Sequence, residues 1–126
     1  MNAQSSSPLP DCPDKPNCVC TQATRPEQAM APLCFSGSAA EAIEQVVRQM
    51  EKLPRVGIIE RRENYLHAVV SSLVFRFKDD VEFYADEQSG LLHFRSASRL
   101  GYSDMGANRR RMERLSELLI LKLKNG

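Results

Sequence analysis

Polar side chains are concentrated in one stretch of the chain, between residues 95 and 111. This stretch reads RSASRLGYSDMGANRRR and holds five arginines, three serines and two glycines, with apolar sequence on both sides. Arginine offers a planar fork that suits bidentate contact with a carboxylate or phosphate. The start of a following helix adds free amides and a partial positive charge. The stretch therefore predicts a site for a small anion or for an acidic group on a partner.

The candidate ligand-binding residues face two ways from one predicted strand. Alternate side chains of an extended segment lie on opposite faces, so Arg95 and Arg99 point to one side and Ser96 and Ser98 to the other. A structural interpretation competes, in which the arginines pair with nearby aspartates. Since neighbouring residues of a helix do not share a face, the arginine run 109–111 is interpreted as a solvated surface. The candidate set comprises Arg95, Ser96, Ser98, Arg99, Ser103, Asp104, Asn108, Arg111, Asp79 and Asp80.

Two adjacent carboxylates, Asp79 and Asp80, offer a second kind of chemistry. Paired acids serve as general acid and base or hold a divalent cation, whereas two aspartates at the end of a strand more often form a turn. An enzyme would use one of them with Arg95 or Arg99 on an anionic substrate. No Gly-rich phosphate loop, H-E-x-x-H or G-x-S-x-G motif occurs, so no catalytic residue is assigned and a non-enzymatic binding module is favoured.

The four cysteines lack the spacing of a metal site. Cys12, Cys18 and Cys20 follow a C-x5-C-x-C pattern, and Cys34 lies further along. Structural zinc sites usually pair cysteines with about two to four residues between them. We therefore expect no metal and no cofactor. Two alternatives remain for Cys12 and Cys18: a disulfide in an oxidising compartment or free thiols in a reducing one.

The composition describes one domain without a strong overall charge. A length of 126 residues fits one domain, and a net charge of +1 argues against a general binder of nucleic acid or membrane surfaces. No apolar run approaches the roughly 18 residues of a membrane helix, and the start MNAQSSSPLP lacks the features of a secretory signal. The chain as it stands is expected in the cytoplasm, or in the periplasm or envelope if an N-terminal segment has been removed. The expected partner is a small anion or a protein, not nucleic acid, and nothing fixes the oligomeric state.

Proline content divides the chain into three parts. Residues 1–10 are predicted to be a disordered tail, residues 11–31 a Cys/Pro-rich irregular arm, and residues 32–126 a single α+β domain. Proline fixes φ and removes a backbone donor, which excludes an ordinary helix or central strand from the arm. The arm from Cys12 to Val19 is expected to fold back onto the domain, because its prolines lower the entropy lost on ordering.

The domain is predicted to place two helices against one sheet. Ser38 and Glu41 form a capping box at the start of a helix that ends before Pro54. A second helix spans about 105–124, with Ser103 or Asp104 as its N-cap. Strand patterns lie between the helices at 56–61, 65–77, 81–85 and 91–97. Their connections are too short for parallel crossovers. The order (β)-α-β-β-β-β-α predicts an antiparallel four- to five-stranded sheet with both helices on one face, which resembles one repeat of the TATA-binding-protein-like fold in topology alone.

Three stretches of the sequence resemble a known protein family. They are CPDKPNC at 12–18, FKDDVEF at 77–83 and FRSASRLGYSDMGANRRRMERL at 94–115. Together they are similar to the bacterial and plant family of the domain of unknown function 1499 (DUF1499). The family implies no established activity. It implies that the Cys-Pro arm, the two aspartates and the Arg-Ser loop (residues 95–104) belong to one unit.

The resemblance also carries a cellular setting and a set of positions. Members often have an N-terminal membrane or lipoprotein segment, which implies an envelope or thylakoid setting and a third function, that of a structural or assembly protein of the cell envelope. Cys20 departs from the family pattern, in which serine is common at that place. The matching positions are Cys12, Pro16, Asn17, Cys18, Asp79, Asp80, Arg95, Ser96, Ser98, Arg99, Gly101, Ser103, Asp104, Gly106, Asn108 and Arg111.

Overall fold

Among its described residues the protein forms two α-helices and six strands, and from β2 onward these follow the predicted order. The structure is a computed structural model that describes residues 7–72 and 77–124. The α+β class and the order β-α-β-β-β-β-α are confirmed. The elements are β1 (Cys18–Cys20), the 3-10 helix η2 (Pro26–Gln28), β2 (Leu33–Cys34), α1 (Ala39–Met50), β3 (Val56–Arg62), β4 (Tyr65–Ser71), β5 (Lys78–Asp86), β6 (Leu91–Ser98) and α2 (Ala107–Lys124).

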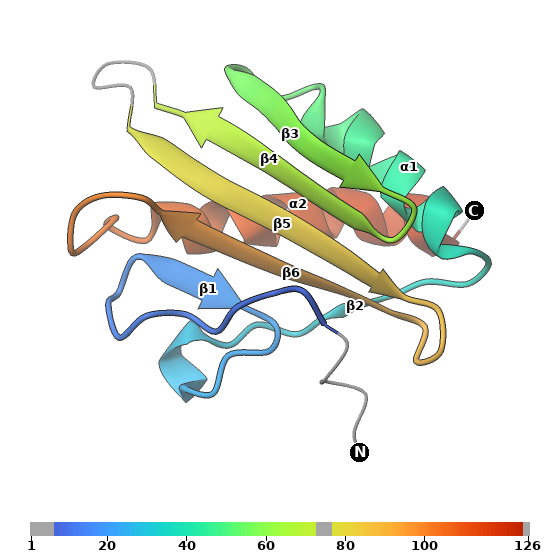
Figure 1. The fold of residues 1–126 in the computed structure, drawn as a ribbon, viewed down its shortest axis with the longest axis horizontal. Helices are drawn as coiled ribbons and strands as arrows, with labels where there is room; N and C mark the ends of the chain where they lie inside the picture. The colour runs from blue at the N-terminus through green and yellow to red at the C-terminus, as the bar shows by residue number, and fades with distance from the viewer. Residues whose placement is uncertain (1–6, 73–76, 125–126) are drawn as a thin grey trace.

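The sheet is antiparallel, and β6 pairs with three other strands, β5, β1 and β2. The strands lie in the order β1-β6-β5-β4-β3, and β2 pairs with a different part of β6. The arm supplies β1, whose Cys18 and Cys20 lie opposite Ala97 and Arg95. Figure 1 shows β1 and β2 side by side with β6 at one edge of the sheet. The sheet therefore gains an arm strand beyond those predicted from the domain alone.

The helices cover one face of the sheet, as predicted, and the core lies between the layers. Ser38 Oγ accepts a hydrogen bond from the Glu41 amide at 3.1 Å, and Glu41 accepts one from the Ser38 amide at 3.1 Å, so the capping box forms. Figure 1 shows α1 and α2 behind the sheet. The largest fully buried side chains of this core include Ile43, Met50, Leu66, Phe83, Phe94, Met112, Leu115 and Leu119.

One strand begins earlier than the sequence indicates. The pattern favours a turn at Asp79 and Asp80, but both residues lie inside β5, opposite Ser98 and Ala97 of β6. Each carboxylate has an arginine partner, which compensates for placing an acidic side chain in a sheet. The turn interpretation is therefore wrong. The preceding strand ends at Ser71, and the rest of the predicted 65–77 segment lies largely outside the described residues.

The arm packs onto the domain, as predicted from its prolines. Cys12, Asn17, Cys18 and Val19 are all buried. The disordered tail predicted at 1–10 lies mostly outside the described residues, but Leu9 is buried in a cluster with two tyrosines of the sheet. In the part of the chain that the structure describes, no helix combines the length and apolar character needed to cross a membrane.

Candidate functional site

The buried amide of Asn108, in the first turn of α2, joins three parts of the chain. Its Nδ2 donates to Asp104 Oδ2 at 2.7 Å and to Ser98 Oγ at 3.0 Å. The same nitrogen lies 3.2 Å from the main-chain oxygen of Asn17, in the arm, so this third contact shares one of its two N–H groups. Its Oδ1 accepts from Ser96 Oγ at 2.5 Å. Because Asn108 is fully buried, this set of bonds, here called the Asn108 network, ties the arm, β6 and α2 together.

Arg111 extends the Asn108 network to β5. Its Nη1 donates to Asn108 Oδ1 at 2.9 Å and to Ser96 Oγ at 3.2 Å, and its Nη2 donates to Asp79 Oδ2 at 2.8 Å. The Arg111 and Asp79 side chains are only 19% and 12% exposed. Both charges are thus held by each other and by fixed dipoles, as a mostly buried ion pair requires.

The start of α2 is capped by the chain's own carboxylate. Asp104 accepts hydrogen bonds from the amides of Gly106 at 2.8 Å and Asn108 at 3.1 Å. Burial raises the pKa of Asp104, but the bonds from Asn108 and Gly106 outweigh it, so the pKa lies below its ordinary value. Neither predicted N-cap residue directly precedes α2, which begins at Ala107, but Asp104 reaches its first amides from the preceding turn, and Ser103 accepts from the Met105 amide. The amides proposed for a bound anion therefore hold Asp104.

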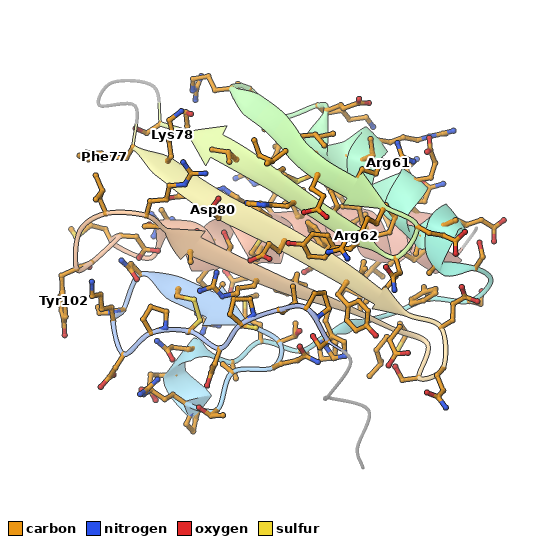
Figure 2. All side chains as sticks on the ribbon, viewed as in Figure 1. Arg61, Arg62, Phe77, Lys78, Asp80 and Tyr102 are labelled. Atoms are coloured by element: carbon orange, nitrogen blue, oxygen red, sulfur yellow. A yellow bond between two sulfur atoms is a disulfide. The ribbon has the colours of Figure 1, made fainter. Side chains whose placement is uncertain are left out.

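The opposite face of the sheet carries a second set of paired charges. Arg99 donates two hydrogen bonds to Asp80, at 2.9 and 3.0 Å, and His67 Nε2 lies 2.7 Å from Asp80 Oδ1. The bonds from Arg99, followed by that from His67, bring the pKa of Asp80 below its ordinary value despite burial. Asp80 lies on the front face of the sheet in Figure 2, away from the helices. Its carboxylate is thus committed to two internal partners.

Glu82 stands beside this pair on the same face. Tyr65 donates its hydroxyl to Glu82 Oε2 at 2.5 Å, and Arg95 Nη1 lies 3.4 Å from Glu82 Oε1. Burial, and then the hydrogen bond to Glu82, raises the pKa of Tyr65. Sequence reasoning missed Tyr65, His67 and Glu82, although their alternation with buried apolar residues along β4 and β5 was a signal for this face.

The structure therefore divides the predicted site residues between two faces. Ser96, Ser98, Asn108 and Arg111 meet Asp79 and Asp104 on the helix side, whereas Arg95 and Arg99 meet Glu82 and Asp80 on the other side. Arg95, Arg99 and Arg111 each have an acidic partner. The competing interpretation, internal pairing of the arginines, accounts for these contacts.

The arm contributes a buried amide and a disulfide to the same region. Asn17 Nδ2 donates to the Gly101 oxygen at 2.8 Å, and the Asn17 oxygen accepts from the Ser98 amide at 3.0 Å. A disulfide joins Cys12 to Cys18, while Cys20 is a buried free thiol whose pKa is raised by burial. Within residues 7–72 and 77–124, no cluster of three or more His, Cys, Asp or Glu side chains is arranged to hold a metal ion.

A cavity of about 380 Å³ lies beside the Asn108 network and brings four arginines together. It is formed by the segment between α1 and β3, the end of β4 and the first half of α2. Among the described residues that line it, none is acidic. We call it the arginine cavity, and its lining residues are Leu53, Pro54, Arg55, Val70, Ser71, Ser72, Ala107, Arg110, Arg111, Arg114, Leu115 and Leu118.

The arginines of this cavity come from two distant parts of the sequence, Arg55 and the start of α2. Arg110 and Arg114 are four residues apart and share a helix face, but Arg55 approaches from another element, which no local pattern reveals. Arg109 turns away and donates to the Glu27 oxygen at 2.9 Å, so the run 109–111 splays, as predicted. The interpretation of the run as a solvated surface is wrong for Arg111, which is only 19% exposed because it is paired with Asp79. Arg55 has φ of +57°, a left-handed conformation that is unfavourable for a residue with a side chain and tends to mark functional sites.

The sequence comparisons agree with the resemblance noted from the motifs. Neither the curated proteins nor the solved structures include a match to this chain. The family described as "Protein of unknown function (DUF1499)" matches residues 8–119, a span that holds the arm, the sheet and most of α2. The chain is therefore a member of the DUF1499 family.

Proposed function

We propose that the protein is a non-enzymatic binding module and that an anionic group binds in the arginine cavity. The observation that carries the proposal is the convergence of Arg55, Arg110, Arg111 and Arg114 on one cavity without an acidic lining residue among those described. Like charges in a partly enclosed, low-dielectric space repel one another, and a bound anion relieves that repulsion.

The hydrogen-bonding capacity of these arginines supports the proposal. Arg114 has no hydrogen-bond or ion-pair partner among the described residues. Arg110 uses Nη1 on the Met105 oxygen at 2.8 Å, and Arg55 uses Nε on the Ser71 oxygen at 3.0 Å. Guanidinium groups have five donors each, so several donors remain for a phosphate, sulfate or carboxylate.

Arg111 gives the cavity a fixed wall. It is held by Asp79, Ser96 and Asn108, which leaves the cavity's added charge to the other three arginines. This arrangement moves the proposed anion site from the Arg-Ser loop, where Arg95 and Arg99 are already paired, to the adjacent cavity.

Catalysis by Asp79 or Asp80 receives less support from the geometry. A general acid or base must reach a reacting group, whereas each of these carboxylates is bound by an arginine at 2.8 or 2.9 Å. A role in assembly of the cell envelope rests on the family setting alone. If the ligand is an acidic group on a partner protein, it would bind in the same cavity.

The test is a titration of the isotope-labelled protein with phosphate, sulfate and acetate, followed by amide NMR. We expect saturable shifts at residues 55, 71–72 and 107–118. Replacement of one unpartnered arginine, Arg114→Gln, is expected to weaken phosphate binding about tenfold, since a hydrogen bond to a charged group contributes roughly 1.5–3 kcal/mol. The matched control is Arg48→Gln, which removes the same charge from an exposed site on α1.

Two results would contradict the proposal. One is an absence of saturable shifts at millimolar anion. The other is a set of shifts confined to residues 95–104 that is insensitive to Arg114→Gln, which would return the site to the Arg-Ser loop. Equal weakening by Arg114→Gln and Arg48→Gln would show a general charge effect and would also reject the cavity.

A further inference from the structure

The arginine cavity has an apolar floor as well as a basic rim. Leu53, Val70, Leu115 and Leu118 all line it. Val70 and Leu115 are buried by the protein itself, so the open apolar surface is that of the partly buried Leu53 and of Leu118, which is 44% exposed. A bare inorganic anion would leave this apolar surface in contact with water. A ligand that combines an anionic group with hydrocarbon would cover both kinds of surface.

The apolar floor continues along α2 beyond the cavity. Arg110, Arg114, Leu118 and Leu121 follow one another at steps of four, four and three residues, so they share one face of the helix. Leu118 is 44% exposed and Leu121 is 63% exposed. The face therefore runs from two cations at its N-terminal end to two exposed leucines at its C-terminal end.

We propose that the arginine cavity binds a dissolved anionic amphiphile, namely a phosphate or carboxylate attached to a short hydrocarbon chain. The headgroup lies among Arg55, Arg110 and Arg114, and the chain extends over Leu118 towards Leu121. This inference rests on the proposed function and adds the class of ligand to it.

The volume of the cavity and the net charge of the protein favour a small dissolved amphiphile over a membrane surface as the ligand. A volume of about 380 Å³ falls within the usual range of small-molecule sites, roughly 300–1,000 Å³. Adsorption to an anionic bilayer favours strongly basic chains, whereas this chain has a net charge of +1. The basic character of the cavity is thus local, and its volume suits a single headgroup.

The experiment compares methyl, butyl and hexyl phosphate at concentrations where each is monomeric, with affinity measured by calorimetry and amide NMR. Each methylene buried against apolar surface raises affinity about fourfold. Since Leu118 is partly exposed, burial is incomplete, and we expect butyl phosphate to bind about tenfold more tightly than methyl phosphate.

Two matched variants test whether the ligand's hydrocarbon chain lies on Leu118. Leu118→Gln is expected to remove most of the dependence on chain length while leaving methyl phosphate affinity within about twofold, because it changes no charge. Ile120→Gln is the control, since Ile120 is 41% exposed on the same helix and lines a neighbouring cavity that shares Arg110 and Arg114 but not Leu118. Ile120→Gln is expected to keep the full dependence on chain length.

The outcomes separate this inference from the proposed function. Binding of methyl phosphate with no gain for the longer chains would overturn the amphiphile proposal and leave the anion site standing. No binding of any phosphate would reject both. Binding of phosphatidylglycerol vesicles that depends on Leu118, without tighter binding of dissolved butyl phosphate, would identify a membrane-surface contact and overturn the proposal of a free ligand.

Discussion

Replacing Asn108 by alanine is expected to destabilise the native state by about 3 kcal/mol, because its buried amide bonds two charged partners, Asp104 and Arg111, as well as neutral groups of β6 and the arm. The bonds to Asp104 and Arg111 contribute roughly 1.5 kcal/mol each at the low end, which gives about 3 kcal/mol, and the neutral bonds would add to this value. Low-end values apply because Asp104, Arg111 and Ser96 each keep another partner when the amide is lost.

Urea denaturation followed by circular dichroism measures this loss, with the disulfide intact in both proteins. A change of about 3 kcal/mol corresponds to a fall in Tm of roughly 10 °C for a domain of this size. Ser103→Ala is the control, because the exposed Ser103 hydroxyl accepts one hydrogen bond, from the Met105 amide, among the described residues, and its loss should cost no more than about 1 kcal/mol. A loss below about 1 kcal/mol for Asn108→Ala would refute the view that the Asn108 network holds the arm, β6 and α2 together.

Two further predictions concern the stability of the protein at low pH and after reduction of its disulfide. The pKa values of Asp80 and Asp104 in the folded state lie below the ordinary 3.8, so their contribution to stability is present above that pH and is lost as pH falls through the lowered values. Urea midpoints measured from pH 7 to pH 2 should therefore fall most steeply below about 4, and Asp80→Asn should flatten part of that fall. Reduction of the Cys12–Cys18 disulfide should destabilise the protein by about 2 kcal/mol, the closure entropy of a short loop, measured by urea unfolding with and without reductant; an unchanged midpoint would contradict this.

Local sequence patterns predicted most of the fold, because capping boxes, apolar stripes and strand alternation each involve residues that are close in sequence. The Ser38–Glu41 capping box, the apolar stripe of α1 and the alternation of β6 each depend on neighbours in sequence. Short connections then left antiparallel pairing as the available topology. The arm strand β1 was missed, because a strand of three residues in a proline-rich segment is specified by its partner β6 rather than by its own sequence.

The candidate site was predicted less completely, because its contacts depend on long-range partners. The sequence marked Arg95, Arg99 and Asp80 as chemically important, but it did not give the pairing of Arg95 with Glu82. The aspartates were interpreted as a turn, since their arginine partners lie 19 and 32 residues away in the chain. Arg55 joined the cavity only through the packing of the α1–β3 segment against α2.

Arg111 connects the structural network to the proposed binding site. Arg111 both donates a hydrogen bond to Asn108 and lines the arginine cavity, so the same side chain serves as an internal ion-pair partner and as a wall of that cavity. Neutralisation by Asp79 lowers the net charge of the cavity, which limits the repulsion that four converging guanidinium groups would otherwise produce. The Asn108 network therefore explains how the chain tolerates this concentration of arginines in the absence of a ligand. It also explains why Arg114, which has no hydrogen-bond or ion-pair partner among the described residues, is the more informative residue to replace in a binding experiment.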